Sequence, residues 1–294
     1  SFQQGKERMS CTPPPDGRRK EGAGMKAIVV VDNIEADGIK GEWGLCIYIE
    51  YNGKKILLDT GASGLFAKNA KKLGLSLDDI SYAVLSHAHY DHSDGMREFF
   101  KINRKAEFYL REDCQENCYA KKWMFSRYIG IGKGILEENK ERIKYVSGDF
   151  TIMDGVSLIP HKTKGLSQIG RREGMYRKEK GKWVLDDFSH EQSLVFDTPK
   201  GLIIFNSCSH GGAGNIIREV MRSFPGKRAL ALIGGFHLYN KPEIFVRELA
   251  GEIKRTGIDT IYTGHCTGEK AFRILKEELG ERAVRLKTGL VMEF

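Results

Sequence analysis

No long hydrophobic run occurs in the 294 residues of the sequence. The longest apolar stretches, at residues 27–31 and 229–233, have about five residues each, whereas a helix that crosses a bilayer needs about 20. The sequence also lacks the nucleophile pattern Gly-x-Ser-x-Gly and the phosphate-binding pattern Gly-x4-Gly-Lys-Ser/Thr. We therefore expect neither a membrane-spanning protein, nor a serine hydrolase with that nucleophile turn, nor a P-loop nucleotide hydrolase.

Cysteine is sparse, with six residues spread over the chain and no dense spacing of the kind that a disulfide framework needs. Such usage is typical of a reducing compartment, so we expect a cytoplasmic protein. Cys114 and Cys118 are separated by three residues, but no second pair completes the spacing of a structural zinc site. The sequence therefore favours two ordinary thiols at these positions.

The excess of positive charge is small. The 47 Lys and Arg residues exceed the 39 Asp and Glu residues by 8, and 40% of the residues are hydrophobic, which excludes a disordered protein. A surplus of this size attracts anions in general, and we do not expect nucleic-acid binding from it. Residues 1–24 carry five basic and three acidic side chains with almost nothing apolar. We interpret them as a disordered leader or an expression remnant.

Strand-like segments occur as hairpins in each half of the remaining chain, with helical segments between them. We predict one α/β domain over residues 25–294, a four-layer αββα sandwich that closes with a strand pair at residues 284–292. Residues 113–128 are predicted to be helical. Residues 161–188 hold eight Lys and Arg against four Asp and Glu, and are predicted to be a long, irregular, basic insertion that forms a lid. The histidines on either side of it, His161 and His190, are predicted to be ordinary surface residues.

The densest group of metal-binding side chains directly follows a buried-looking strand at residues 80–86. It reads His-Ala-His-Tyr-Asp-His, with three imidazoles and one carboxylate in six residues. Histidine and aspartate ligate zinc, iron and manganese, and a strand end holds them in fixed directions. In an extended loop His87 and His89 point the same way, while Asp91 and His92 lie one turn onward. The spacing therefore predicts two neighbouring metals, with two of these ligands each.

This motif resembles the signature of the metallo-β-lactamase superfamily, whose members are αββα sandwiches with their metals at the sheet edge. Two further landmarks are similar. Asp59 in Leu-Leu-Asp-Thr-Gly matches an early aspartate that supports the metal site by hydrogen bonding, and His265 in Tyr-Thr-Gly-His-Cys-Thr-Gly matches the final histidine ligand. The resemblance covers about residues 25–294. It implies one or two divalent transition metals as cofactors, with zinc preferred over iron or manganese.

The middle motifs depart from the common pattern of that family. Cys208 stands where a bridging aspartate is expected, and it is either a thiolate ligand or a small buried residue beneath the site. His210 is the candidate third ligand of the first metal, with a supporting histidine as the alternative. The segments Cys-Ser-His, Gly-Gly-Phe-His and His-Cys-Thr-Gly together resemble the branch named for dihydropterin-ribofuranosylaminobenzene phosphate synthase. The turn at Gly234 and Gly235 lets His237 face the pocket, unless that histidine is only structural.

The sequence offers candidate residues for metal binding, catalysis and substrate binding. The predicted metal ligands are His87, His89, Asp91, His92, His210 and His265. Asp59 and Cys208 are supporting residues or further ligands. The candidate catalytic residues are Asp91, which would orient a water molecule, and His237, which would donate to the leaving group or contact the substrate. Arg171 and Arg172 in the basic insertion would bind an anion, unless that run of charge is only a solvated face.

The expected function is hydrolysis of a small anionic or phosphorylated molecule through a metal-bound hydroxide, because a metal lowers the pKa of water from 15.7 to about 7. The branch resemblance implies an alternative, a transferase that joins a pterin and an aminobenzene partner in an aromatic-lined cleft. The aromatic residues considered for that cleft are Tyr90, Trp123, Phe125, Tyr176, Trp183 and Phe236. The expected partner is thus a small molecule, without a membrane, and association into a homo-oligomer stays open.

Overall fold

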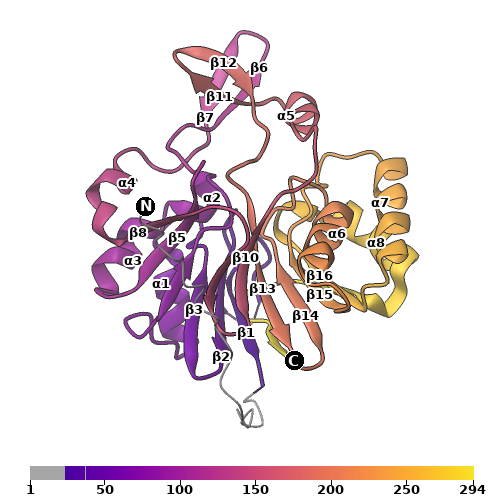
Figure 1. The fold of residues 1–294 in the computed structure, drawn as a ribbon, viewed down its shortest axis with the longest axis horizontal. Helices are drawn as coiled ribbons and strands as arrows, with labels where there is room; N and C mark the ends of the chain where they lie inside the picture. The colour runs from indigo at the N-terminus through magenta and orange to yellow at the C-terminus, as the bar shows by residue number, and fades with distance from the viewer. Residues whose placement is uncertain (1–23, 37) are drawn as a thin grey trace, which may run out of the picture.

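Two seven-stranded sheets pack face to face at the centre of the computed structural model, which describes residues 24–36 and 38–294 (Figure 1). The predicted leader lies almost wholly outside the described residues. The first sheet has the order β18-β1-β2-β3-β4-β5-β8. Its strands are β1 (Lys26–Val31), β2 (Cys46–Tyr51), β3 (Lys54–Leu58), β4 (Tyr82–Val84), β5 (Glu107–Arg111), β8 (Ile143–Val146) and β18 (Val291–Glu293).

The second sheet has the order β17-β16-β15-β14-β13-β10-β9. Its strands are β9 (Phe150–Met153), β10 (Val156–Pro160), β13 (Gln192–Thr198), β14 (Gly201–Phe205), β15 (Ala229–Gly234), β16 (Thr260–Thr263) and β17 (Ala283–Arg285). The predicted closing pair is wrong, because β17 pairs with β16 whereas β18 pairs with β1 in the other sheet. The last two strands therefore tie the chain end into both sheets.

Helices cover the outer face of each sheet, so the predicted four-layer order is confirmed (Figure 1). The helices are α1 (Leu65–Lys72), α2 (Tyr90–Ser93), α3 (Met96–Ile102), α4 (Ile135–Glu138), α5 (Ser167–Glu173), α6 (Ala213–Ser223), α7 (Glu243–Thr256) and α8 (Glu269–Leu279), with short 3-10 turns at η1 (Lys140–Arg142), η2 (His265–Thr267) and η3 (Gly280–Arg282). None of the helices in the described ranges is long and apolar enough to traverse a bilayer.

Strand alternation explains why the layers form. In β14, Leu202 and Ile204 pack under the helices, whereas Ile203 and Phe205 point into the core between the two sheets. Successive side chains of a strand face opposite ways, so a strand that is apolar at every position is buried on both faces. The sequence of β14, Gly-Leu-Ile-Ile-Phe, therefore specifies a central strand of a covered sheet.

A third, four-stranded sheet corrects two sequence predictions. Its order is β12-β11-β6-β7, from β6 (Tyr119–Lys122), β7 (Phe125–Tyr128), β11 (Met175–Glu179) and β12 (Lys182–Leu185). Residues 113–128 are thus not helical, and residues 161–188 are not irregular but contain α5 and a hairpin. The two hairpins pair with each other through β6 and β11, and together they stand above one end of the sandwich (Figure 1). Pairing between segments about 55 residues apart stabilises them, which local patterns cannot indicate.

Candidate metal centre

The candidate site residues follow the carboxyl ends of parallel strands. Strands β3 and β4 are parallel neighbours in the first sheet, and β14, β15 and β16 are parallel neighbours in the second. The carboxyl ends of parallel strands meet at one edge of a sheet, so loops that are distant in sequence come together there. Asp59 follows β3, the His-x-His-x-Asp-His motif follows β4, and the remaining candidates follow β14, β15 and β16. This edge faces the third sheet.

Three imidazoles form what we call the first metal cluster: His87, His89 and His210. The ring centroids lie 4.6 Å apart for His87 and His89, and 5.0 and 4.9 Å from His210. All three are buried, and Nε2 of His87, Nε2 of His89 and both ring nitrogens of His210 have no hydrogen-bond partner. Burial lowers the pKa of each ring, in His89 to about 3, so the rings are neutral at pH 7. A buried ring nitrogen without a hydrogen-bond partner costs free energy of folding. Neutral imidazole rings with free lone pairs are suited to bind a metal ion.

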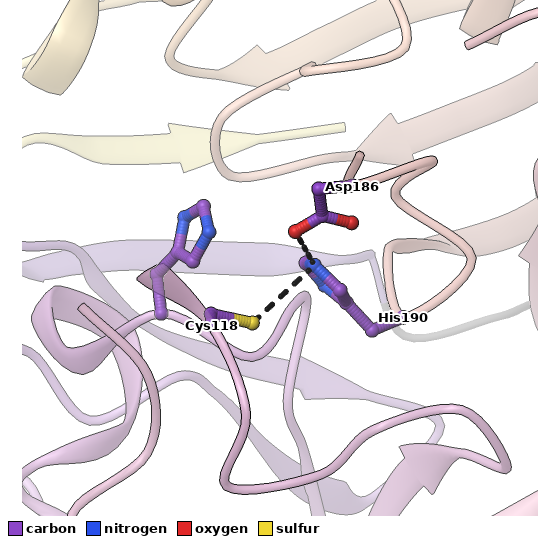
Figure 2. A group of neighbouring side chains, drawn as sticks. Cys118, Asp186 and His190 are labelled. Carbon is purple, nitrogen blue, oxygen red and sulfur yellow. Dashed lines mark hydrogen bonds and ion pairs between the residues drawn. The ribbon is translucent and has the colours of Figure 1, made fainter. Parts of the chain in front are cut away.

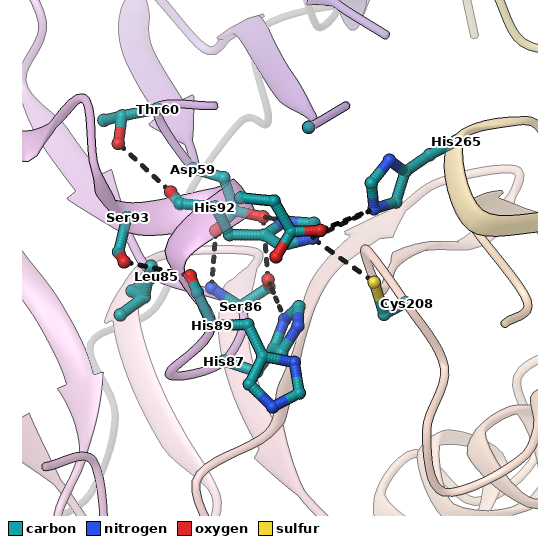
Figure 3. A network of polar contacts seen from close by, with 12 residues as sticks. Asp59, Thr60, Leu85, Ser86, His87, His89, His92, Ser93, Cys208 and His265 are labelled. Carbon is teal, nitrogen blue, oxygen red and sulfur yellow. Dashed lines mark hydrogen bonds and ion pairs between the residues drawn. The ribbon is translucent and has the colours of Figure 1, made fainter. Parts of the chain in front are cut away.

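Four donor atoms form the second metal cluster: Asp91 Oδ2, His92 Nε2, His265 Nε2 and Cys208 Sγ. Figure 3 shows His92, His265 and Cys208. His92 Nε2 lies 3.2 Å from His265 Nε2, 3.3 Å from Cys208 Sγ and 3.6 Å from Asp91 Oδ2. Asp91 Oδ2 lies 3.3 Å from His265 Nε2. Metal–nitrogen bonds of about 2.0–2.1 Å give tetrahedral ligand separations of about 3.3 Å. The donor atoms of His92, His265 and Cys208 all lie within 4.8 Å of one another and fit one tetrahedral ion, with the Cys208 thiolate as a ligand. Asp91 Oδ2 lies close enough to both rings to supply the fourth donor.

The charge state of the second cluster also suits a cation. Burial opposes ionisation of Asp91, but the neighbouring His92 and His265 rings outweigh it and hold the pKa of its carboxyl below the usual range. Burial likewise opposes protonation of His265, yet Cys266 and Asp91 raise the pKa of that ring to about 9. A metal ion that binds here takes the place of that proton.

Asp59 orients ligands of both clusters (Figure 3). Its Oδ1 accepts a hydrogen bond from the Ser86 backbone N–H at 2.7 Å, and its Oδ2 accepts the Ser86 hydroxyl at 2.7 Å and His92 Nδ1–H at 2.8 Å. Because the Ser86 hydroxyl donates to Asp59, its oxygen can only accept from His87 Nδ1–H, at 2.8 Å. Each ring thus carries its proton on Nδ1, and each Nε2 keeps its lone pair for a metal.

His265 and His210 are held by residues outside the predicted set. His265 Nδ1 lies 2.9 Å from Asn33 Oδ1, and the His265 backbone N–H donates to Asp32 at 2.8 Å. The ring of His210 stacks on Phe188, with centroids 4.8 Å apart and planes 1° from parallel. Asp32 and Asn33 directly follow β1, so the rule that polar residues after a buried strand mark the site could have identified them.

His190 and Asp186 lie behind the first cluster, and Figure 2 shows them with Cys118. The Ala88 backbone N–H donates to His190 Nδ1 at 3.2 Å, so the ring proton lies on Nε2, which is 3.1 Å from Asp186 Oδ2 and 3.7 Å from Cys118 Sγ. A protonated Nε2 cannot ligate a metal. We interpret this group as a support that fixes Ala88 between the ligands on either side of it. His190 is 1% exposed, so its prediction as a surface residue is wrong.

The side chain of His161 is only 7% exposed and lies among carboxylates. Its ring contacts Glu191 and lies 3.0 Å from Glu219 Oε2. We call Glu191 and Glu219 the glutamate pair. Burial opposes protonation, but the glutamate pair raises the pKa of His161 to about 9. The Oε1 atom of Glu191 in turn accepts the His210 backbone N–H at 3.0 Å. This network anchors the loop that carries the third ligand of the first cluster.

Four residues of the site other than glycine adopt a positive φ: Asp59 (60°), Ser209 (52°), His237 (48°) and His265 (44°). Such backbone is sparsely populated for residues with a Cβ and persists where the surrounding structure determines it. All four lie in the loops after the strands, within or beside the two clusters. The concentration of strain at this edge supports its assignment as the functional site.

A cavity of about 250 Å³ opens beside both clusters. His89, His210, Asp91 and Cys208 contribute to its wall from the metal clusters. The other lining residues are Trp43, Tyr90, Ala120, Arg127, Ile129, Glu173, Met175, His237, Tyr239 and Cys266. The third sheet thus supplies one side of the cavity and the strand-end loops supply the other.

The cavity changes the candidate substrate contacts. Arg127 of β7 lines it, with its guanidinium 5.9 Å from the ring centroid of Tyr90, and makes no ion pair with a described residue. Arg171 and Arg172 are exposed in the last turn of α5 and are not among the lining residues, whereas Glu173 next to them is. That carboxylate contacts Lys241 and lies 3.7 Å from His237 Nε2. The segment 161–188 therefore borders the site, but through the acidic side chain of Glu173 and the apolar side chain of Met175.

The aromatic lining also differs from the prediction. Of the six aromatic residues considered for a cleft, only Tyr90 is a lining residue. Trp123 and Phe125 are 90% and 80% exposed at the tip of the β6–β7 hairpin, which points away from the core. Trp43 and Tyr239 line the cavity instead, with ring centroids 5.5 Å apart. No sequence signal marked these two residues, because their position depends on how the loops meet.

Known proteins are similar to this chain in sequence. Residues 43–173 match the family model described as the metallo-beta-lactamase superfamily. A 7,8-dihydropterin-6-methyl-4-(beta-D-ribofuranosyl)-aminobenzene-5'-phosphate synthase of Methanocaldococcus jannaschii is 31% identical over 268 residues, 84% of this chain and 88% of that protein. An uncharacterised protein of the same organism is 29% identical over 85% of this chain and 93% of its own length.

Solved structures show the same fold. The crystal structure of Tm1679, a metal-dependent hydrolase of the beta-lactamase superfamily, is 28% identical and superposes with a TM-score of 0.77, over 92% of this chain and 99% of that one. The metallo-beta-lactamase fold protein YhfI from Bacillus subtilis reaches a TM-score of 0.55 at 12% identity, over 92% of this chain and all of that chain. The second likeness concerns the fold alone.

Proposed function

Because the chain belongs to the metallo-β-lactamase superfamily, we propose that it is a metal-dependent hydrolase of a small anionic molecule, with the reaction at the cavity beside the two metal clusters. The observation that carries this proposal is the set of bare, buried imidazole nitrogens in the first cluster, next to four donors at tetrahedral spacing in the second. Divalent transition metals bound there, zinc by donor set, would supply Lewis acidity and lower the pKa of water.

The chain's own residues have separable roles in this proposal. Asp91 is ionised and lines the cavity, so it accepts a hydrogen bond from the attacking water and orients it. His237 also lines the cavity, with its ring centroid 4.5 Å from that of His210 and its buried Nδ1 without a hydrogen-bond partner. It is placed to donate a proton to the leaving group. Arg127 binds the anionic part of the substrate, because it is the lining residue that carries an unpaired positive charge.

A matched pair of arginine variants tests the substrate class. The metal-loaded protein is assayed with phosphate esters, thioesters and neutral lactones. We expect Arg127→Ala to raise KM for an anionic substrate by about 10-fold or more, since a charge-assisted hydrogen bond contributes about 1.5–3 kcal/mol, while Arg171→Ala leaves KM unchanged. Equal KM values for Arg127→Ala and the parent protein would exclude Arg127 from substrate binding. If none of these substrates is turned over when it is supplied alone with water, the proposal of a hydrolase is excluded.

The second candidate function is transfer between two substrates. The 31% identity to the aminobenzene phosphate synthase supports it, as does the aromatic wall of Trp43, Tyr90 and Tyr239, which could hold flat rings. A transferase of this type requires both a dihydropterin and an aminobenzene phosphate partner, whereas a hydrolase consumes one substrate with water. Product formation only when both are supplied would therefore favour the transferase.

A further inference from the structure

Two thiols meet on the wall of the cavity. Cys208 follows β14 and Cys266 lies in the η2 turn after β16, and their Sγ atoms are 3.5 Å apart. Both residues line the cavity, so small solutes can reach them although each is at most 2% exposed. We propose that Cys208 and Cys266 form a reversible disulfide when a hydroperoxide enters the cavity, and that this bond removes the thiolate ligand of the second metal cluster.

The surrounding backbone holds the two sulfur atoms in reach of each other. Strands β14 and β16 both pair in parallel with β15, which fixes the loops that follow them. A Cβ on Gly235 would lie 2.5 Å from Cys266 Sγ, so only glycine leaves room for the sulfur at that position. The His237 backbone N–H donates to the same sulfur at 3.2 Å. A disulfide bond of about 2.05 Å requires the two sulfur atoms to approach each other by about 1.5 Å.

The proposed chemistry balances with one peroxide. The Cys266 sulfur attacks one oxygen of hydrogen peroxide, the O–O bond breaks, and a sulfenic acid and one water form. The Cys208 sulfur then attacks the Cys266 sulfur and expels the second water. In total, the Cys266 thiol, the Cys208 thiolate, one proton from solvent and one hydrogen peroxide give one disulfide and two waters, with two electrons passing from sulfur to oxygen. A dithiol reductant reverses the bond by thiol–disulfide exchange.

The consequence for the metal rests on the proposed function. Cys208 Sγ lies 3.3 Å from His92 Nε2 within the second cluster and within 4.8 Å of ligand atoms of His87 and His210, but our assignment gives the first ion its three imidazoles alone. Oxidation would therefore remove one of four donors from the second ion and none from the first. We expect release of the second ion, half of the metal in a fully loaded protein, and its return after reduction.

Peptide mapping and metal release test the proposal on the full chain. The metal-loaded protein is treated with hydrogen peroxide, digested without reduction and analysed by mass spectrometry, while a chromogenic chelator reports free metal. We expect a peptide pair that joins Cys208 to Cys266, a mass loss of about 2 Da that dithiothreitol reverses, and metal release with the same time course. Cys266→Ser should abolish the cross-link and slow the release at least 10-fold. Cys46→Ala, which removes a buried thiol outside both clusters, should change neither.

Three results would overturn it. Peroxide that gives only sulfinic or sulfonic acid at Cys208 or Cys266 shows that the disulfide does not form. A cross-link that instead joins Cys114 to Cys118 places the reactive pair elsewhere. If the parent protein and Cys266→Ser release metal at the same rate, the disulfide is not the cause of the release. The same mapping on the metal-free parent protein tests the disulfide without any bound metal, so its result does not depend on the metal proposal.

Discussion

Replacing Asp59 by asparagine should weaken both metals, because this one carboxylate fixes the proton positions of a ligand in each cluster. In the native chain it accepts from His92 Nδ1–H directly and from the Ser86 hydroxyl, which in turn accepts from His87. An asparagine amide nitrogen would donate to the Ser86 oxygen. The hydroxyl would then turn its hydrogen toward His87 Nδ1, and the ring proton would move to Nε2, the atom that a metal needs.

The size of the effect follows from these contacts. Loss of an outer hydrogen-bond partner costs about 10–100-fold in metal affinity, which is about 1.4–2.7 kcal/mol per metal. Asp59→Asn should impose this cost on both metals, since it disturbs His92 and His87 together. Ser86→Ala breaks only the link to His87, so it should weaken one metal and spare the other. The matched surface variant is Asp79→Asn, which loses an exposed ion pair with Lys55.

The assay is a titration of the metal-free protein with zinc against a chelator of known affinity. Two binding steps should shift in Asp59→Asn, one in Ser86→Ala and none in Asp79→Asn. Thermal unfolding of each metal-free variant shows whether the fold is retained. If Asp59→Asn folds and binds both metals within 3-fold of the parent affinity, the orienting role of Asp59 is refuted.

Three further predictions follow from the same contacts. His87→Ala should lose bound metal and activity together, and full metal content by mass spectrometry with normal turnover would contradict its role as a ligand. The glutamate pair raises the pKa of His161 to about 9, against about 6.5 in the unfolded chain, so stability present below pH 6.5 should fall by up to about 3 kcal/mol as the pH rises through 9. Urea unfolding of His161→Gln should lack this loss, and an identical pH profile would refute the assignment. Gly235→Ala would press a methyl group against Cys266 Sγ, 2.5 Å away, and should lower the melting temperature by several degrees; an unchanged value would show that the loop relaxes.

Much of the site could be predicted because its information is local. His87, His89, Asp91 and His92 are close in sequence and directly follow an apolar strand, so spacing alone places them at a sheet edge. The layered fold was predicted from strand hairpins in each half of the chain with helical segments between them. The position of Cys208 against His92 could not be decided in the same way, because it depends on how β14 and α2 approach each other across the two sheets.

The failed predictions share one physical cause. Residues 119–128 form a hairpin because β6 pairs with β11, a partner that the local pattern does not reveal. The choice of Arg171 and Arg172 for substrate binding by charge count stays a prediction, but the residues that line the cavity are Glu173, beside them, and Arg127, from the misassigned segment. In each case tertiary contacts between distant segments decided the outcome.

Anomalous diffraction at the zinc absorption edge, measured on crystals of the zinc-loaded protein, tests the assignment of the two metal clusters most directly. We expect two peaks about 3.5–4 Å apart. One should lie among His87, His89 and His210, and the other within bonding distance of Cys208 Sγ and its three partner ligands. A map without peaks at this edge would contradict the assignment, as would a peak among Cys118, Asp186 and His190 instead.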